Sequence, residues 1–336
     1  MSSIIIKDGY RPALNAYETQ RAIGKVKRIF EDHLCDALNL KRVSAPLFVL
    51  TGTGLNDDLN GVERPVEFDI PETGTRAQVA QSLAKWKRMA LYRYGFGVGE
   101  GLYTDMNAIR RDEFLDNIHS IYVDQWDWEK VIDAPMRNEQ TLRNTVTKIV
   151  RAVCDTQVAI QRLFPALPMR QLCRDVSFIT TQELEDLYPD LTPRQREDAY
   201  LREHKTAFIM QIGDTLKSGI SHDGRAPDYD DWTLNGDIFF WHEVLECAYE
   251  LSSMGIRVDA PTLTAQLNKA GCPERALLPF HRALLDGILP LTMGGGIGQS
   301  RLCMLLLEKM HIGEVQVSIW DRATMDACKA AGIKLL

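Results

Sequence analysis

Residues 293–301, MGGGIGQSR, form the most restrictive stretch of this sequence. Three consecutive glycines and a fourth one residue later precede Arg301 and the apolar run Leu302–Leu307. A dinucleotide fingerprint requires glycines at its first, third and sixth positions near the start of a βαβ unit, and a P-loop requires Gly-Lys followed by Ser or Thr. Neither pattern is present. The stretch is therefore either a tight turn, with Arg301 solvated at a helix start, or a nucleotide-binding loop of another kind.

The composition is typical of a globular protein and limits the function. The chain has 336 residues and a net charge of -7, which argues against a dominant nucleic-acid surface. Its seven cysteines contain no CxxC pair, which argues against a disulfide framework or a structural zinc site. No segment resembles a signal peptide or a membrane span, so we expect a cytoplasmic protein without a membrane partner. Without repeats or linkers, residues 1–336 are predicted to form one domain.

Hydrophobic periodicity predicts helices and strands in an irregular order. Apolar residues at three- and four-residue steps predict helices, and alternation predicts strands. The helices are expected at 16–40, 81–94 and 141–164, and the strands at 43–49, 118–123, 208–213, 236–241, 244–252 and 314–320. This order excludes a doubly wound parallel fold and indicates a mixed fold whose sheet is mostly antiparallel.

Carboxylates are concentrated in the last third of the chain. RAPDYDDWTLNGD, residues 225–237, carries four aspartates, and the alternating segment that follows places Glu246 and Glu250 on one face. If the strand at 236–241 pairs antiparallel with this segment, Asp237 lies near Glu250. Such carboxylates suit Mg²⁺, which also keeps waters and substrate phosphates. Paired acids more often form a solvated surface, but a glycine run and nearby arginines favour a magnesium–ATP site.

Two arginines are candidates for contact with ATP. Transfer of an adenylyl group builds negative charge at the α-phosphate, and preorganised cations stabilise that charge. Arginine is preferred because its rigid fork binds phosphate bidentately. Arg110 in AIRRDE and Arg301 after the glycines are these candidates.

Seven segments, in order along nearly the whole chain, carry a specific resemblance. They are QSLAKWKR, GEGLYTDM, HSIYVDQWDWE, RAPDYDDW, LNGDI, ELSSMGIRVD and GGGIGQSRL. The chain resembles the ammonia-dependent asparagine synthetases, the A-type aspartate–ammonia ligases, which are related to class II aminoacyl-tRNA synthetases. The resemblance implies an α+β fold with an antiparallel sheet flanked by helices, in a homodimer. It also implies synthesis of asparagine from aspartate, ATP and ammonia through β-aspartyl-AMP, with release of AMP and pyrophosphate.

The resemblance also places the three class II motifs. The first helix and the segment ending at Pro46 resemble the dimer-forming motif, and IRRDE resembles the second motif, with Arg110 on the α-phosphate and Glu113 as its acid. GGGIGQSR resembles the third motif, in which Arg301 braces ATP against a glycine strand. The implied ATP contacts are Arg110, Glu113, Asp237, Glu250, Gly294, Gly295, Gly296, Gly298 and Arg301, with Asp237 and Glu250 as the magnesium ligands.

Further residues are implied as contacts to the substrate aspartate. They are Asp57, Ser82, Lys87, Gln125, Asp127, Asp230, Ser252 and Ser253. An α-ammonium group needs carboxylates, so Asp57, Asp127 or Asp230 is expected to hold it, while Lys87 meets a substrate carboxylate. Asp57 is also the hypothetical base for the attacking ammonia. The expected catalytic set is Asp57, Lys87, Arg110 and Arg301.

Two departures from the family pattern and three alternatives remain. Gln81 replaces a histidine, and only Thr233 separates DYDDW from LNGD, where bacterial relatives have a longer loop. A glutamine-dependent synthetase is disfavoured because Ser2 replaces the N-terminal cysteine nucleophile. An aminoacyl-tRNA synthetase relative is disfavoured because no added tRNA-binding domain is apparent. A non-catalytic binding paralogue is disfavoured because the charged set Lys87, Arg110, Asp237, Glu250 and Arg301 is intact.

Overall fold

The computed structural model describes residues 4–57 and 63–336. Within these residues no helix combines the length and the apolar character that a membrane crossing requires. Ser2 lies outside the described part. The helices are α1 (Ala16–Leu38), α2 (Ala84–Tyr94), α3 (Glu139–Leu163), α4 (Thr181–Leu187), α5 (Pro193–His204), α6 (Ala260–Lys269), α7 (Pro279–Leu285), α8 (Gln299–Leu306) and α9 (Arg322–Ala330). The strands are β1 (Leu40–Arg42), β2 (Phe48–Leu50), β3 (Glu67–Ile70), β4 (Thr75–Val79), β5 (Gly101–Ile109), β6 (Tyr122–Val131), β7 (Ser177–Thr180), β8 (Thr206–Met210), β9 (Asp230–His242), β10 (Cys247–Arg257) and β11 (Thr292–Gly298).

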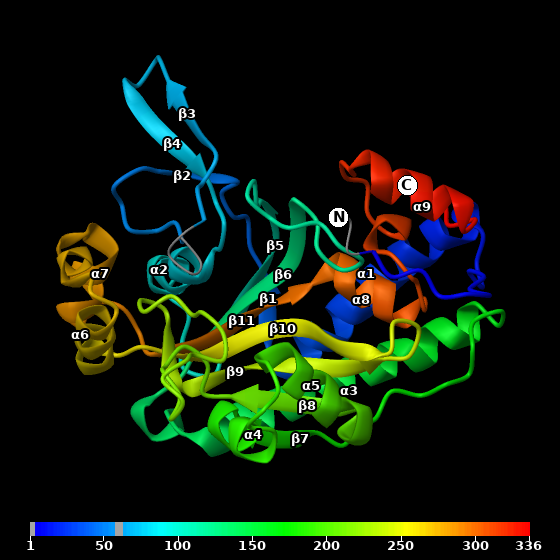
Figure 1. Cartoon of the computed structure of the whole chain (residues 1–336). Coiled ribbons are helices and arrows are strands. Elements are labelled where there is room, and N and C mark those ends of the chain that lie inside the picture. Colours follow the sequence, from blue (N-terminus) through cyan, green and yellow to red (C-terminus); the bar gives the residue numbers. More distant parts are fainter. Residues whose placement is uncertain (1–3, 58–62) are drawn as a thin grey trace.

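An eight-stranded sheet in the order β1-β5-β6-β11-β10-β9-β8-β7 forms the centre of the molecule (Figure 1). Neighbouring strands from β5 to β8 are antiparallel, and only the outer pairs β1–β5 and β7–β8 are parallel. The prediction of a mostly antiparallel sheet with flanking helices is therefore confirmed. A second sheet, β2-β4-β3, projects from one side.

The two faces of the large sheet are covered differently. On one face α1, α3 and α8 pack against the sheet in a continuous apolar core that contains Trp126, Trp128 and Tyr249. On the other face α4 and α5 cover β7–β9 at one end, while α2 packs on β5, β6 and β11. Of the helices in the described residues, none covers the part of this second face between α2 and α5, and the candidate site lies there.

The predicted long helices are confirmed, and their boundaries have local causes. The Asn15 side chain accepts the Glu18 backbone N–H while Glu18 bonds back to Asn15, so α1 begins at Ala16. Asn39 ends α1 in the left-handed conformation, with φ of 57°. The Asn138 side chain caps α3 by accepting the Thr141 N–H.

Several strand predictions were wrong in their limits. The strand expected at 118–123 is β6, which starts at Tyr122, because the Asp116 carboxylate accepts the N–H groups of Ile118 and His119 and turns the chain before it. The strand expected at 208–213 stops at Met210, because Gln211 adopts a φ of 64°.

Two other predicted strands failed more completely. The alternation over 43–49 is not a strand: only Phe48–Leu50 pairs, and Leu47 is 55% exposed. Residues 314–320 form no strand either, because a short 3₁₀ turn, Ile312–Glu314, is followed by irregular chain in which Val317 and Ile319 face solvent. An alternating pattern predicts a strand only where a partner strand is available.

Candidate active site

The glycine run is a strand at the centre of the sheet, not a loop. In β11, Gly294, Gly295 and Gly296 pair with Gly255, Met254 and Ser253 of β10 on one side and with β6 on the other. A Cβ on Gly295 would lie 2.5 Å from the Met254 Cβ, whereas one on Gly296 would lie 2.2 Å from the Gln125 Oε1. Gly295 thus permits close packing on the core face, and Gly296 leaves space on the opposite face.

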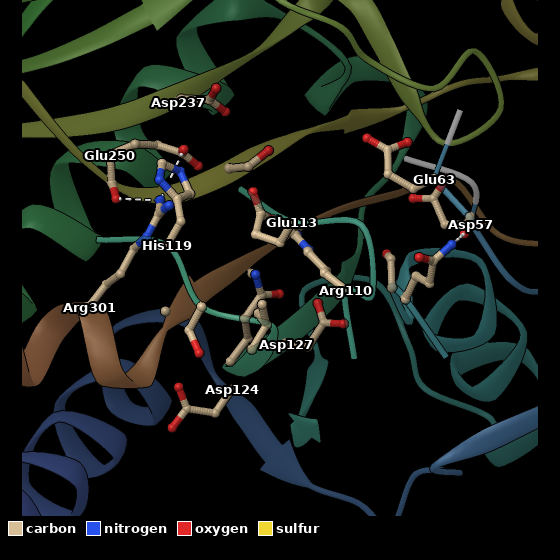
Figure 2. A pocket seen from close by; sticks show the side chains of 18 of the residues that line it. Asp57, Glu63, Arg110, Glu113, His119, Asp124, Asp127, Asp237, Glu250 and Arg301 are labelled. Atoms are coloured by element: carbon tan, nitrogen blue, oxygen red, sulfur yellow. Dashed lines mark hydrogen bonds and ion pairs between the residues drawn. The ribbon is translucent and has the colours of Figure 1, made fainter. Parts of the chain in front are cut away.

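That opposite face carries a pocket of about 370 Å³. Most of the predicted residues line it: Asp57, Ser82, Arg110, Glu113, Gln125, Asp127, Asp230, Asp237, Glu250, Ser253, Gly295, Gly296, Gly298 and Arg301. Figure 2 shows Glu250 and Arg301 at one end of the pocket and Asp57 at the other, with Arg110 and Glu113 between them. Residues from seven separate segments of the sequence therefore converge on one cavity.

Arg301 and Glu250 form a pair at the end of the glycine strand. The Arg301 Nη1 lies 3.1 Å from the Glu250 Oε2 and 2.9 Å from the Glu250 carbonyl oxygen. Burial alone would raise the pKa of Glu250, but Arg301 outweighs this effect and holds that pKa below its usual value. Arg301 is therefore not a solvated helix-start residue; it lies in the first turn of α8 and lines the pocket.

Asp237 lies on β9 opposite Ser253, and it lines the same pocket as Glu250 on the neighbouring strand β10. Burial raises the pKa of Asp237 to about 7; Arg225 opposes this shift and Glu250 adds to it. The predicted proximity of the two carboxylates is confirmed. Two nearby carboxylates, one of which is costly to ionise because it is buried, suit a divalent cation. Such a cation takes its remaining ligands from water molecules and phosphate groups. Among the described residues no group of three or more His, Cys, Asp or Glu side chains is arranged to hold a metal.

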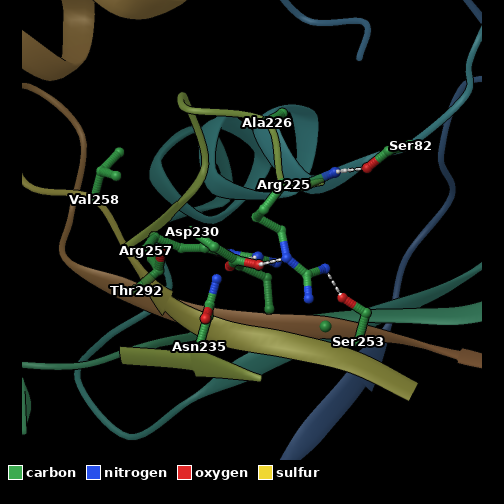
Figure 3. Close-up of polar contacts among 12 residues, drawn as sticks. Ser82, Arg225, Ala226, Asp230, Asn235, Ser253, Arg257, Val258 and Thr292 are labelled. Carbon is green, nitrogen blue, oxygen red and sulfur yellow. Dashed lines mark hydrogen bonds and ion pairs between the residues drawn. The ribbon is translucent and has the colours of Figure 1, made fainter. Parts of the chain in front are cut away.

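Arg225 is a pocket residue that the sequence analysis missed. Its Nη2 lies 2.6 Å from the Asp237 Oδ1. Its Nη1 donates to the Ser253 hydroxyl and its Nε lies 4.0 Å from the Asp230 Oδ2, two contacts that Figure 3 draws. Its side chain is only 8% exposed. The available signal was its position at the start of RAPDYDDW, directly before the acidic cluster.

Arg257, which lines the pocket, forms an ion pair with Glu129 beneath it, and the sequence analysis did not predict this pair. The Arg257 Nη2 lies 2.7 Å from the Glu129 Oε2, and its Nη1 donates to Asp230. Gly294, predicted to contact ATP, does not line the pocket. A Cβ there would lie 2.0 Å from the Glu129 Oε2, so Gly294 makes room for this ion pair.

Lys87 lies deeper than the sequence analysis predicted. It is fully buried and does not line the pocket. Its Nζ donates to the Asp127 carboxylate and to the Trp128 carbonyl oxygen at 2.8 Å, and lies 3.6 Å from Glu129. Burial raises the pKa of Asp127, and Lys87 only partly offsets this. In this structure Lys87 pairs with Asp127 in the pocket wall and with Glu129 beneath it, and its contact with substrate stays a prediction.

Ser252 is also displaced from its predicted face. The strand β10 carries a bulge between Glu250 and Ser252, which shifts the alternation by one residue. Ser252 therefore lies opposite Ile297 and does not line the pocket, whereas Ser253 lies opposite Gly296 and does. The regular alternation predicted for this segment was wrong beyond Glu250.

Comparison with solved structures defines the class of fold. Asparaginyl-tRNA synthetase from Entamoeba histolytica, in complex with asparaginyl-adenylate, superposes with a TM-score of 0.67 over 95% of this chain and 73% of that chain, at 13% identity. The asparaginyl-tRNA synthetase from Pyrococcus horikoshii, also complexed with asparaginyl-adenylate, gives a TM-score of 0.64 over 89% of this chain and 68% of that chain, at 14% identity. The fold is thus that of the class II aminoacyl-tRNA synthetases.

Sequence comparison identifies the family within this class. A sequence model of the aspartate–ammonia ligase family matches residues 17–332. Aspartate–ammonia ligase from Ruminiclostridium cellulolyticum is 59% identical over 337 residues, covering 100% of both chains. The enzyme of the same name from Lactobacillus johnsonii is 58% identical over 338 residues, again covering 100% of both. The chain belongs to the aspartate–ammonia ligase family.

Proposed function

We propose that this protein makes L-asparagine from L-aspartate, ATP and ammonia through β-aspartyl-AMP, releasing AMP and pyrophosphate. The observation that carries the proposal is the family membership together with the convergence of Arg110, Arg301 and the Asp237–Glu250 pair on one pocket. Arg110 and Arg301 are cations suited to the charge that builds at the α-phosphate during attack. We expect the reaction to take place in the cytoplasm. We also expect residues 1–336 to form a single catalytic domain.

Asp237 and Glu250 are the proposed ligands of a magnesium ion bound with ATP. The fit rests on the donor set, because Asp237 and Glu250 face one pocket from neighbouring strands and offer the oxygen ligands that Mg²⁺ prefers. When bound, Mg²⁺ would neutralise phosphate charge. Arg225 holds the Asp237 carboxylate at 2.6 Å and thus orients it. Arg301 orients Glu250 in the same way.

The other end of the pocket is the proposed aspartate site. Asp57, Asp127 and Asp230 offer carboxylates for the substrate ammonium group, and Gln125 and Ser82 offer polar side chains beside them. Arg225 lines the pocket between Asp230 and Ser253, so we assign the contact with a substrate carboxylate to Arg225. Lys87 is paired with Asp127, so it affects the substrate carboxylate only through Asp127 unless substrate binding separates the two side chains.

Asp57 is the proposed base for the nucleophile. It is 3% exposed and lies at the end of the pocket away from Arg301. The amine that attacks the acyl carbon must lose a proton, and a nearby carboxylate accepts it. Asp57→Asn is expected to lower asparagine formation at least tenfold while adenylate formation, measured by aspartate-dependent exchange of pyrophosphate into ATP, is largely retained. Full ammonia-dependent turnover would exclude this role.

A homodimer is proposed from the resemblance of α1, β1 and Pro46 to the dimer-forming motif of class II enzymes. In support, β1 is an edge strand of the large sheet, and large apolar side chains are exposed on nearby segments, among them Phe48 at 45%, Tyr92 at 54% and Tyr94 at 55%. Light scattering of the purified chain should give twice the mass of 38.1 kDa. A monomer at micromolar concentration would contradict this.

Product analysis tests the main proposal. Purified protein with aspartate, Mg·ATP and ammonium should yield asparagine and AMP in equal amounts, dependent on ammonium. Asparagine with ADP would overturn the adenylate route and the role of Arg110. If no asparagine forms although ATP binds, charging of tRNA with aspartate or asparagine, measured in the same preparation, would identify an aminoacyl-tRNA synthetase activity instead.

A further inference from the structure

A second cavity of about 260 Å³ lies beside the main pocket. Its walls are the chain after β2 (Leu50–Asp57), Lys85 at the start of α2, and Leu278 and His281 at α7. The Thr53 carbonyl oxygen accepts the Phe280 N–H at 3.3 Å, so the chain after β2 lies against α7. Asp57 lines both cavities, so it stands in the wall between them.

The second cavity contains a buried ionic cluster that the proposed adenylate chemistry does not use. Asp228 is 1% exposed, and its Oδ2 accepts from the Lys85 Nζ at 2.9 Å and lies 2.9 Å from the His281 Nε2. Lys85 and His281 are 3% and 0% exposed. Three ionisable groups held this deep are costly to desolvate, so their presence here needs an explanation.

Two acceptor atoms of this cluster have no partner. Within the described residues, neither the Asp228 Oδ1 nor the His281 Nδ1 has a hydrogen-bond partner. With the His281 Nε2–H donating to Asp228, the Nδ1 atom carries a lone pair and accepts. A buried polar atom left unpaired costs about 1–3 kcal/mol, so such atoms indicate a bound water or ligand. A molecule that pairs with both atoms must therefore be a donor of hydrogen bonds.

The charges in the cavity favour a small donor over an anion. The Asp228 and Asp57 carboxylates balance Lys85 and Arg275, whose Nη1 lies 3.6 Å from the Asp228 Oδ2. An anion would face the unpaired carboxylate oxygen of Asp228, which repels it. Ammonium, or ammonia in equilibrium with it, is small and offers at least three N–H donors to the two free acceptors.

We propose that this second cavity is the route by which ammonia reaches the main pocket, with Asp228 and His281 as its binding groups and Asp57 at the junction. The inference rests on the proposed function, because it concerns the nitrogen donor of that reaction. Aspartate and ATP fill the main pocket before ammonia attacks. A separate route lets ammonia approach the acyl carbon from the Asp57 side while aspartate and ATP occupy the main pocket.

Blocking the cavity tests this route. Leu278→Trp places an indole in the cavity wall, and Leu277→Trp adds the same group at the neighbouring position, which is 66% exposed and does not line the cavity. For Leu278→Trp we expect the KM for ammonium chloride to rise at least tenfold and the ratio of AMP to asparagine to increase, because stranded adenylate hydrolyses. Aspartate-dependent pyrophosphate exchange should stay within twofold of the wild type. Leu277→Trp should behave as the wild type in every measurement.

A second variant keeps the test decisive if Leu278→Trp fails to fold. Thr53→Tyr fills the same cavity from the chain after β2 and should also raise the ammonium KM without changing pyrophosphate exchange. Asp228→Asn removes the charge of the binding group and should raise the ammonium KM while leaving the KM for aspartate unchanged.

The two proposals fail in different ways. An unchanged ammonium KM and product ratio in a blocked variant that retains pyrophosphate exchange would overturn the ammonia route. Wild-type protein that makes no asparagine would overturn the proposed function itself.

Discussion

The two faces of the large sheet are formed by the same strands but are stabilised by different interactions. In β6, Trp126 and Trp128 enter the apolar core. Gln125, Asp127 and Glu129, which alternate with them along the strand, point to the pocket side. The core face is stabilised by apolar packing, and such packing tolerates substitutions by apolar side chains of similar volume. The pocket face is held by paired charges, where removing one partner leaves the other buried and uncompensated. Stability is therefore concentrated on the first face and sensitivity to single charges on the second.

The largest expected loss comes from breaking a buried pair on the pocket face. Arg257→Met strands Glu129, which is fully buried and whose pKa is held down, against the effect of burial, by Arg257 and Lys87. We expect the free energy of unfolding to fall by about 3–5 kcal/mol, measured by urea denaturation. The double variant Arg257→Met, Glu129→Leu should recover much of this loss. If the single variant is as stable as the wild type, the pocket face is not held by charges.

The next prediction separates function from stability on the same face. Arg301→Ala should lower aspartate-dependent pyrophosphate exchange about 10²–10³-fold, as expected for loss of a preorganised cation at the developing charge. Its effect on unfolding should be much smaller than that of Arg257→Met, because the remaining Glu250 is partly exposed. Arg322→Ala, at a side chain 87% exposed, is the control and should leave exchange unchanged. Equal effects of the two variants would remove Arg301 from the ATP site.

A pair of adjacent glycines compares the two faces directly. Gly295→Ala pushes a methyl group against the Met254 backbone and Cβ, so we expect a loss of about 1–3 kcal/mol in stability with little change in KM among folded molecules. Gly296→Ala meets only the movable end of Gln125 and should raise the KM for substrates with less loss of stability. Thermal unfolding and steady-state kinetics measure both. If Gly295→Ala mainly raised KM and Gly296→Ala mainly lowered stability, Gly295 would face the pocket and Gly296 the core.

The last prediction concerns an acid sensitivity of the core face. Burial lowers the pKa of His242 to about 3 and that of His311 to about 4. Both are neutral in the folded state but take up a proton in the unfolded state below about pH 6.5, so stability is complete above that pH and falls below it. Each contributes about 1.4 kcal/mol per pH unit down to its folded pKa.

Urea unfolding between pH 7 and pH 5 measures this effect. The slope of the unfolding free energy against pH measures how many protons the chain takes up on unfolding. His242→Gln should lower this number by about one, whereas His204→Gln, at an exposed position, should leave it unchanged. An unaltered slope in the His242 variant would show that this imidazole is not kept neutral by burial.

Much of the fold was predictable because its signals are local. The long helices carry complete periodicity and capping residues, as at Asn15 and Asn138, and these decide their limits without tertiary information. The strand expected at 314–320 failed because alternation cannot show whether a partner strand exists.

The pocket was predicted less completely. Residues such as Asp57 and Arg301 were found through motifs, but Arg225 and Arg257 were missed because pairing across strands depends on register. Lys87 was placed in the pocket because its sequence position shows charge but not depth. The bulge after Glu250 left no sequence signal, so Ser252 was assigned to the wrong face.

That bulge gives the chain a form of reading frame. On its N-terminal side Glu250 meets the pocket, and on its C-terminal side Ser253 and Arg257 do, three and seven residues further on. With all residues retained, a regular strand without the bulge would turn Ser253 and Arg257 toward the helices while Glu250 stayed in place, whereas deletion of one residue at the bulge would leave both facing the pocket. A one-residue deletion beyond the bulge, at Met254 for example, would be a frameshift in side-chain direction for Arg257 as long as the bulge persists, whereas a substitution there would alter one contact. Register, more than the identity of a single residue, is the property of this segment that natural variants must preserve.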